Sequence, residues 1–336
     1  MALRWAIVGA GDIAEKCVAG AIVTAPNSTL DMAMRRDEVK LGDFAERWNV
    51  PKRATRLEEV LANPDIDAVY VATPVHLHRE QTVLAAQAGK HVLVEKPMAM
   101  SSTDCEEMMR ACTDSGVKLG IAFYQRFNAR HQKMREWIAA GRIGQIVGAR
   151  IQFGEYYPDT EGAWRQIPSL GGGGTIMDTG SHCVDTLRAL LGAEVRQVTG
   201  FVDTLVFSYA VDDTASFLLR FDNGAHAIVT SFWTTPGAEQ EGLNIVEVYG
   251  TEGRMVAAPI NAKNSEGTLR LTRTNESIEY TGDQNTHVAM LEDFVQAVDE
   301  DRDPQVAGRD GLLNMRVLEA AVRSSGTGQA VPVDLA

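Results

Sequence analysis

The sequence predicts an α/β fold of two domains, an N-terminal Rossmann doubly wound parallel sheet and a C-terminal α+β domain with a large open, mostly antiparallel sheet. Short apolar runs alternate with helical stretches in the first third of the chain, which is typical of parallel strands buried on both faces. Beyond about residue 122, strand-like runs follow one another across short turns, which favours antiparallel pairing. A chain of 336 residues also exceeds the size at which one hydrophobic core stops growing.

The dinucleotide-binding domain is predicted over residues 1–122. Ser101 and Ser102 can cap its last helix, and Gly116 can end that helix. The expected strands are residues 3–8, 30–34, 68–72, 91–94 and 118–123. The expected helices are residues 13–25, 57–62, 79–88 and 102–115.

The substrate-binding domain is predicted over residues 123–336. Asp222-Asn223-Gly224 is a hairpin turn signal between two of its strands. The expected strands are residues 146–155, 195–202, 215–221, 225–232, 243–249 and 268–272, and the expected helices are residues 130–140, 288–299 and 312–324. An open sheet leaves one face for self-association, so a homo-oligomer is one expectation for this domain.

Composition narrows the class of protein. With 32 basic and 45 acidic residues the net charge is −13, so the chain should repel nucleic acid and anionic membranes. No apolar run approaches the length of a membrane span, and no signal peptide is visible. The four cysteines are scattered, with no Cys-x-x-Cys pair, which argues against disulfides and zinc. These features predict a cytoplasmic protein.

A glycine turn follows the first strand and is the strongest cofactor signal. Gly9, Gly11 and Ala14 form a Gly-x-Gly-x-x-Ala motif with Ala10, Asp12 and Ile13 between them. The first glycine allows a tight turn, the second leaves room for a pyrophosphate, and the alanine lets the helix pack closely. The amino end of the helix attracts phosphates. The alternative is a plain strand–helix turn, which the strand before and the helix after make less favourable.

The end of the second strand distinguishes the two nicotinamide cofactors. Arg35 and Arg36 stand where an NAD site often carries an acidic residue, and guanidinium groups suit a 2′-phosphate. This favours NADP(H), with NAD(H) as the alternative. Asp37 could bind a ribose hydroxyl instead, and one of the arginines could be solvated.

Three residues are candidates for the chemistry. Asp178 and His182 are four residues apart and would share one face of a helix that follows a glycine run. His182 could exchange a proton with an alcohol or carbonyl, and Asp178 could orient it or bind a hydroxyl. Lys96, in Glu95-Lys96-Pro97, could donate a proton or polarise a carbonyl. Singly, each has a structural alternative: a solvated lysine, a helix-capping aspartate, a packed core histidine.

A metal centre is a weaker hypothesis. His76 and His78 form a His-x-His pair that could join Asp178 and His182. No further cluster of ligands is evident, and hydride transfer to a nicotinamide needs no metal. We therefore expect none.

Taken in order, the motifs resemble the glucose–fructose oxidoreductase / inositol dehydrogenase family of NAD(P)-dependent enzymes. The resemblance covers nearly the whole chain and depends on the glycine turn, the strand end at Thr73-Pro74, Glu95-Lys96-Pro97 and the glycine run before Asp178. It implies a Rossmann domain followed by a domain with a large open sheet. It also implies that Lys96, Asp178 and His182 line the reaction site. The cofactor contacts that it implies in the first domain are Thr73, Pro74, His76, His78 and Glu95.

Within that family, the sequence is most similar to the 1,5-anhydro-D-fructose reductase branch, which uses NADPH. The match includes residues 78–82 and the pair Trp164-Arg165, which in that branch approaches the cofactor. His287 falls where that branch places a substrate-contacting tyrosine. The chain departs in having Gly11 where the branch has serine, and Arg35 where it also has serine.

The predicted function is therefore an NADP(H)-dependent oxidoreductase of a sugar, anhydro-sugar or cyclitol. Its substrate would lie between the nicotinamide and the group Lys96, Asp178 and His182. Two alternatives stay open: a non-catalytic sensor that binds the dinucleotide, and a reductase of a non-sugar substrate such as an aromatic diol.

Overall fold

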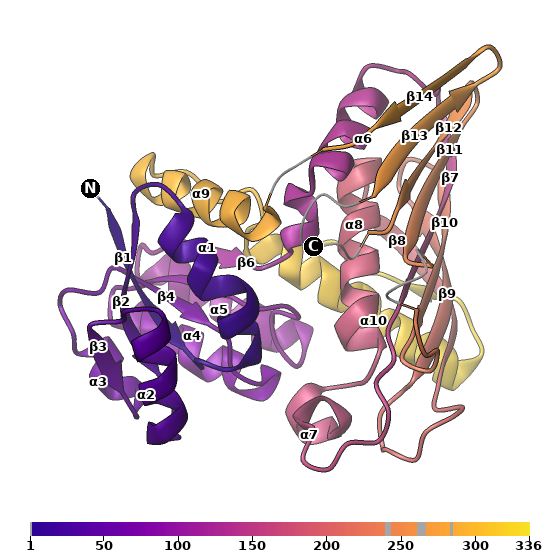
Figure 1. Ribbon diagram of the computed structural model, residues 1–336. Helices are drawn as coiled ribbons and strands as arrows, with labels where there is room; N and C mark the ends of the chain where they lie inside the picture. The colour runs from indigo at the N-terminus through magenta and orange to yellow at the C-terminus, as the bar shows by residue number, and fades with distance from the viewer. Residues whose placement is uncertain (1, 239–242, 261–266, 283–284) are drawn as a thin grey trace. The chain divides into compact units, whose positions relative to one another are not determined.

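A computed structural model describes residues 2–238, 243–260, 267–282 and 285–336. The chain forms two compact units (Figure 1). Unit 1 contains the residues up to Phe123 together with His287–Leu312, and unit 2 contains Tyr124–Thr286 and Leu313–Ala336.

Unit 1 is built on a six-stranded, wholly parallel sheet in the order β3-β2-β1-β4-β5-β6. The first strand, β1, is central: β2 and β3 lie on one side of it, and β4, β5 and β6 lie on the other. The parallel crossovers in such a sheet are right-handed, which places the helices of the two halves on opposite faces. The strands are β1 (Leu3–Val8), β2 (Ser28–Met34), β3 (Lys52–Ala54), β4 (Ala68–Val71), β5 (His91–Val94) and β6 (Leu119–Ile121).

The helices of unit 1 follow the strands in turn. The first begins with a π-helical turn, η1 (Ala14–Val18), and continues as α1 (Ala19–Thr24). The others are α2 (Glu38–Arg47), α3 (Leu57–Leu61), the short η2 (Val75–Leu77), α4 (His78–Gln87), α5 (Ser102–Asp114) and α9 (Thr286–Asp299). The sequence did not indicate α2 and β3, because α2 is largely polar and β3 has only three residues.

Residues 287–312 return to unit 1 although they follow all but the last, two-residue strand of the second sheet in sequence. The Phe294 ring of α9 lies 5.3 Å from the buried Trp5 ring of β1. A side chain at Gly120 would come within 2.8 Å of Phe294, so that glycine lets α9 approach β6. Lys118 forms an ion pair with Asp301 at 2.7 Å. The sequence predicts a single boundary between residues 122 and 123, whereas the contacts also place residues 287–312 in unit 1. The sequence does not indicate this because the packing partners are far apart along the chain.

Unit 2 contains a nine-stranded sheet in the order β14-β13-β12-β11-β7-β10-β9-β8-β15. Only the pair β7 and β10 is parallel among the strands described, so the sheet is mostly antiparallel. The strands are β7 (Ile146–Gly154), β8 (Val195–Asp203), β9 (Thr214–Phe221), β10 (His226–Phe232), β11 (Ile245–Gly250), β12 (Gly253–Ala258), β13 (Thr268–Arg273), β14 (Glu276–Tyr280) and β15 (Val331–Pro332). The predicted fold class is confirmed, whereas β12, β14 and the two-residue β15 were not foreseen.

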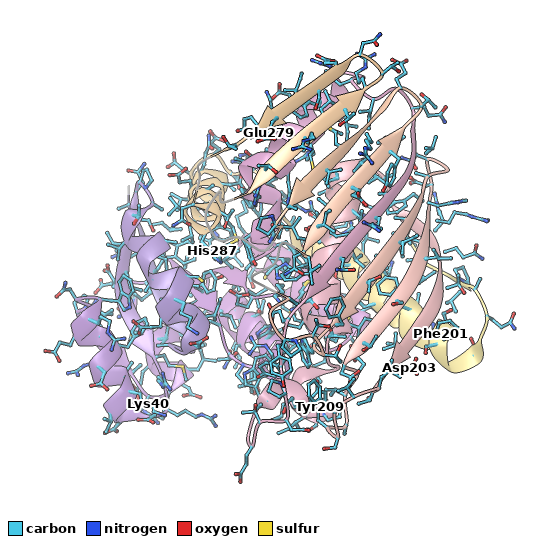
Figure 2. All side chains as sticks on the ribbon, turned by 45° about the vertical axis from the view of Figure 1, so that its right-hand side comes forward. Lys40, Phe201, Asp203, Tyr209, Glu279 and His287 are labelled. Atoms are coloured by element: carbon cyan, nitrogen blue, oxygen red, sulfur yellow. The ribbon has the colours of Figure 1, made fainter. Side chains whose placement is uncertain are left out.

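One face of this sheet is covered by helices. The inward side chains of β9 alternate with exposed ones, so Phe217 and Leu219 are buried while Leu218 is 50% exposed. Helices α6 (Ala129–Ala139) and α8 (Ser181–Leu191) pack on the buried face. The exposed residues Phe201 and Asp203 of β8 lie on the opposite face of the sheet (Figure 2). The helical segments of unit 2 are η3 (Tyr124–Phe127), α6 (Ala129–Ala139), η4 (Trp164–Gln166), α7 (Pro168–Gly171), η5 (Ile176–Gly180) and α8 (Ser181–Leu191), and the chain continues through α10 (Gly308–Thr327). None of the helices in the described ranges has the length and hydropathy that crossing a membrane requires.

Candidate dinucleotide and reaction sites

The glycine turn lies where the carboxyl ends of β1 and β4 meet. Gly9 has φ +94°, and a Cβ on it would come within 2.8 Å of the Ala72 carbonyl carbon, so the backbones approach too closely for any other residue. Gly11 differs, because a Cβ on it would have only the Gly9 oxygen, at 3.8 Å, within 4 Å among the described residues beyond its chain neighbours. Gly9 is therefore required by the fold, while Gly11 leaves open space above the turn for a ligand.

A helix starts directly after the turn. Its first backbone bond runs from the Glu15 N–H to the Gly11 oxygen at 3.0 Å, so the amides of the turn precede the helical ladder. Asp12 is exposed and pairs with Lys16 at 2.8 Å. The π-helical turn η1 lies in this first stretch, and such turns are frequent at functional sites. The turn and the helix start together fit a dinucleotide pyrophosphate.

The three charged residues that follow β2 make different contacts. The Arg35 guanidinium donates a hydrogen bond to the Ala10 oxygen at 2.7 Å, so this side chain folds back over the glycine turn. Arg36 is exposed. Asp37 caps α2 by accepting the Lys40 N–H at 3.1 Å, and that bond holds the pKa of its carboxyl below the usual value. The carboxylate that could have bonded a ribose is thus engaged by its own helix.

Two loops of unit 1 carry the other cofactor residues predicted in this unit. Thr73 donates to Gln81 at 2.7 Å at the end of β4. Glu95, at the end of β5, accepts the hydroxyl of Tyr70 at 2.7 Å and the N–H of Lys96 at 3.2 Å. Burial raises the pKa of Tyr70 well above its usual value, so this hydroxyl stays a donor to the carboxylate. Lys96 is half-buried and precedes a cis bond to Pro97.

His78 joins these two loops. Its Nε2 lies 2.9 Å from the Thr73 oxygen and its Nδ1 lies 3.1 Å from the Pro97 oxygen. The side chain is 1% exposed, and burial lowers the pKa of the imidazole to about 4. The structure therefore gives His78 a connecting role between the loops, whereas His76, two residues earlier, is half-buried.

Unit 2 brings together four of the predicted site residues. Asp178 lies in the π-helical turn η5, and His182 lies in the first turn of α8. Asp178 pairs with Arg165 at 3.9 Å, and the Arg165 guanidinium stacks 4.3 Å from the Trp164 ring. The His182 ring, 4% exposed, lies 5.0 Å from the Tyr124 ring and 5.6 Å from the Phe153 ring. An anion, a cation and an imidazole are thus presented from one helix start and its neighbouring loop.

A buried ion-pair network stabilises helix α8. The sequence indicates this network only weakly. Arg126 binds Asp185 with two nitrogens, at 2.6 and 2.9 Å. Arg188 binds Glu194 at 2.6 Å and approaches Asp185 at 3.9 Å. Asp185 and Arg188 are nearly inaccessible to solvent. Asp185 and Arg188 lie one and two helical turns after His182, which is the one feature of the sequence that indicates them. Their partners Arg126 and Glu194 come from other segments of the chain.

Other predicted features lie elsewhere. His287 is 3% exposed and lies near the start of α9 in unit 1 (Figure 2). Within the described part of the chain, no three His, Cys, Asp or Glu residues are grouped as metal ligands.

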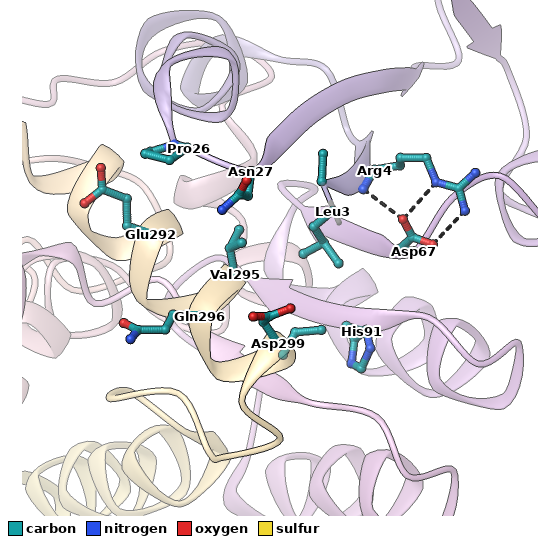
Figure 3. Close-up of a pocket in the computed structure, with 12 residues that line it drawn as sticks. Leu3, Arg4, Pro26, Asn27, Asp67, His91, Glu292, Val295, Gln296 and Asp299 are labelled. Carbon is teal, nitrogen blue, oxygen red and sulfur yellow. Dashed lines mark hydrogen bonds and ion pairs between the residues drawn. The ribbon is translucent and has the colours of Figure 1, made fainter.

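Unit 1 also has a pocket of about 1060 Å³ (Figure 3). It is lined by Leu3 and His91, the first residues of β1 and β5, and by the Arg4–Asp67 ion pair. It therefore lies at the amino ends of the strands, opposite the edge at which parallel sheets bind dinucleotides.

The fold and the glycine turn define a dinucleotide-binding protein. Residues 3–123 match the family described as "Oxidoreductase family, NAD-binding Rossmann fold", and residues 131–256 match the "GFO/IDH/MocA C-terminal domain". The chain belongs to this GFO/IDH/MocA oxidoreductase family, so it is an NAD(P)-dependent enzyme.

Several relatives align with the chain from end to end. It is 34% identical to a 1,5-anhydro-D-fructose reductase of Ensifer adhaerens, over 98% of both chains. It is 30% identical to a D-xylose 1-dehydrogenase (NADP(+)) of Haloferax volcanii, over 99% of this chain and 100% of the relative. Among solved structures, the aldose-aldose oxidoreductase of Caulobacter crescentus, complexed with glycerol, superposes with a TM-score of 0.92 at 30% identity, over 99% of this chain and 100% of that one.

We expect Gly11→Val to keep the fold and to weaken dinucleotide binding by about tenfold or more, because the new side chain occupies the open space above the turn. Titration of NADPH, followed by its fluorescence, measures the effect. Gly326→Val in α10 is the matched control, since a Cβ there meets no described atom within 4 Å. Wild-type affinity in a folded Gly11→Val protein would contradict the site.

The lowered pKa of His78 is expected to make the stability of the fold depend on pH. Its folded pKa of about 4 lies below the usual 6.5, so the unfolded chain takes up a proton first as the pH falls. The contribution is intact above pH 6.5 and is lost progressively between pH 6.5 and about 4, by about 3 kcal/mol in total. Urea unfolding of His78→Gln across this range should show a shallower decline than wild type, and His226→Gln, at an exposed position, serves as control. Equal slopes for wild type and His78→Gln would refute this role.

Proposed function

We propose that this enzyme transfers a hydride between NADP(H) and a carbon of a sugar, anhydro-sugar or cyclitol that carries a hydroxyl or carbonyl group. The observation that carries the proposal is the end-to-end relationship with three proteins whose names specify sugar substrates: an anhydro-fructose reductase, a xylose dehydrogenase and an aldose-aldose oxidoreductase. The polar group around Asp178 is consistent with a hydroxyl-rich ligand.

The proposed cofactor site is the carboxyl edge of the parallel sheet. The turn would hold the pyrophosphate through its amides, and the loops at Thr73 and Glu95 would approach the nicotinamide half. Arg36 and Arg35 would bind the 2′-phosphate, an assignment supported by the engagement of Asp37 in the α2 cap. The proposed cofactor contacts are Gly9, Ala10, Gly11, Asp12, Ile13, Arg35, Arg36, Thr73, Pro74, His76, His78, Glu95, Lys96, Trp164 and Arg165.

The proposed reaction needs one proton transfer to accompany the hydride. The bound nicotinamide supplies or accepts the hydride at carbon. In the reducing direction, Lys96 or His182 donates a proton to the substrate oxygen as the C=O bond becomes C–OH, and in the oxidising direction the same group takes that proton back. Asp178 accepts a hydrogen bond from a substrate hydroxyl, with the Arg165 guanidinium 3.9 Å from its carboxylate. His287 is the further proposed substrate contact.

A second substrate class is supported by relatives whose name specifies an aromatic diol. The chain is 33% identical to a trans-1,2-dihydrobenzene-1,2-diol dehydrogenase of Mus musculus over 68% of both chains. A substrate panel should therefore contain trans-diols of aromatic rings beside aldoses, anhydro-sugars and cyclitols.

Lys96→Met is expected to lower turnover by about a hundredfold or more while cofactor affinity stays within about twofold, because methionine keeps most of the side chain and removes the proton donor, and the other proposed cofactor contacts remain. Steady-state rates with the best sugar, together with NADPH titration, test this. Lys52→Met is the control, since Lys52 pairs with Asp65 at the start of β3. A Lys96→Met enzyme that retains most of its turnover would remove Lys96 from the mechanism.

Replacing Arg35 and Arg36 with alanine is expected to lower the ratio of kcat/KM for NADPH to that for NADH by about tenfold or more, because only NADPH carries the 2′-phosphate that the two guanidinium groups would bind. Arg110→Ala, at an exposed position of α5, should leave the ratio unchanged. An unchanged ratio in the double variant, whether or not both rates fall, would contradict the assignment of the 2′-phosphate to these arginines.

A further inference from the structure

We infer that Asp212 is a positioning residue, which holds the π-helical turn η5 in the shape that presents Asp178 to the substrate. This inference rests on the proposed function of Asp178. Asp212 lies just before β9, more than thirty residues after the turn in sequence, and no motif in the sequence indicates its involvement.

The Asp212 carboxylate binds the backbone at the start of η5. One carboxylate oxygen accepts the Gly174 N–H at 2.7 Å, and the other accepts the Ile176 N–H at 2.7 Å. The main-chain oxygen of Asp212 accepts the Thr175 N–H at 3.0 Å. Three consecutive amides at a helix start are thus satisfied by one residue, where a capping side chain ordinarily satisfies one.

The close approach of the two segments is built into the glycine run. A Cβ on Gly174 would collide with the Asp212 main-chain oxygen. Gly174 therefore allows the contact, and this accounts for one glycine of the run that leads to Asp178.

A hydroxyl cluster holds the other side of the turn. The Ser231 hydroxyl lies 2.6 Å from the Thr175 hydroxyl and 2.6 Å from that of Thr179, and all three residues are buried. The Thr175 oxygen accepts the Gly180 N–H at 2.9 Å, which is the i to i+5 bond that defines a π turn, and it also accepts the Ser231 hydroxyl at 3.0 Å. A π turn is rare in isolation, so these contacts supply the stabilisation that keeps it here.

Asp212 is itself fixed in place by its neighbour. The Asp213 carboxylate accepts the N–H groups of Leu205, Val206 and Phe207 at 2.8 to 2.9 Å, and the Asp213 oxygen accepts the Trp233 N–H at 2.8 Å. Asp212 therefore extends from an anchored loop. Burial raises the pKa of the Asp212 carboxyl, while its hydrogen bonds to the Ile176 and Gly174 amides oppose that rise.

The consequence concerns Asp178. It lies between Ile176, which Asp212 binds, and Thr179, which Ser231 binds. The extra residue of the π turn places Asp178 differently about the helix axis than an uninterrupted α-helix would, and in this position Asp178 pairs with Arg165. Loss of the Asp212 contacts should let this turn relax toward an ordinary α-helical start and move the Asp178 carboxylate, with unit 1 and its cofactor turn unaffected.

The test compares Asp212→Asn with Asp222→Asn. Asp222 lies at the other end of β9, where its carboxylate accepts the Glu194 N–H at 3.2 Å, so its replacement removes the same charge and a similar bond far from η5. Ser231→Ala, a smaller change on the other side of the turn, is the second variant if Asp212→Asn does not fold. Amide hydrogen exchange over residues 174–182, NADPH affinity, and kcat and KM for the best sugar of the panel are measured for each protein.

We expect Asp212→Asn and Ser231→Ala to speed exchange in residues 174–182 alone and to lower kcat per NADPH-binding site by about tenfold or more, with NADPH affinity unchanged. Asp222→Asn should match wild type in all three measurements. Unchanged exchange at 174–182, an unchanged kcat per site, or the same loss in Asp222→Asn would overturn the inference. Should wild type turn over no member of the panel, the proposed function fails, and the exchange data alone decide whether Asp212 holds the turn.

Discussion

The close approach of β1 and β4 is the constraint on which the arrangement of unit 1 depends. Gly9 alone fits against the Ala72 backbone, and this contact brings the glycine turn beside the loop that starts at Thr73. His78 then ties that loop to the one after β5, which carries Glu95 and Lys96. Three separate sequence motifs thereby reach one edge of the sheet through backbone contacts, and the polar side chains of the proposed cofactor site extend from that frame.

In unit 2 the proposed site residues are positioned by side-chain hydrogen bonds and ion pairs, whereas in unit 1 they are positioned by the close approach of two strands. Asp212 and a three-hydroxyl cluster hold η5, while the buried pair Arg126–Asp185 holds α8 behind it. A buried pair of charges stabilises little by itself, but removing one partner is costly because the other is left without compensation. Such contacts specify one orientation for Asp178 and His182, as the proposed hydride and proton transfer would require.

The sequence predicted the fold class and the glycine turn because those signals are local: a strand, three small residues and a helix start within twelve positions. It could not predict the return of residues 287–312 to unit 1, since the packing of Phe294 on Trp5 joins segments at opposite ends of the chain. The π turn was also missed, because a helical period of 3.6 assumes no inserted residue. Asp212 and Ser231 carried no motif at all, and only their hydrogen bonds identify them.

We propose that the enzyme reduces or oxidises sugar-like substrates with NADP(H). The most direct measurement follows the absorbance of the reduced nicotinamide while purified protein is mixed with NADPH or NADP⁺ and each member of a panel of anhydro-sugars, aldoses, cyclitols and aromatic trans-diols. We expect stoichiometric turnover with at least one sugar-like member, faster with the phosphorylated cofactor than with NADH or NAD⁺. Tight cofactor binding without turnover of any sugar-like member, or turnover of the diols alone, would contradict the claim.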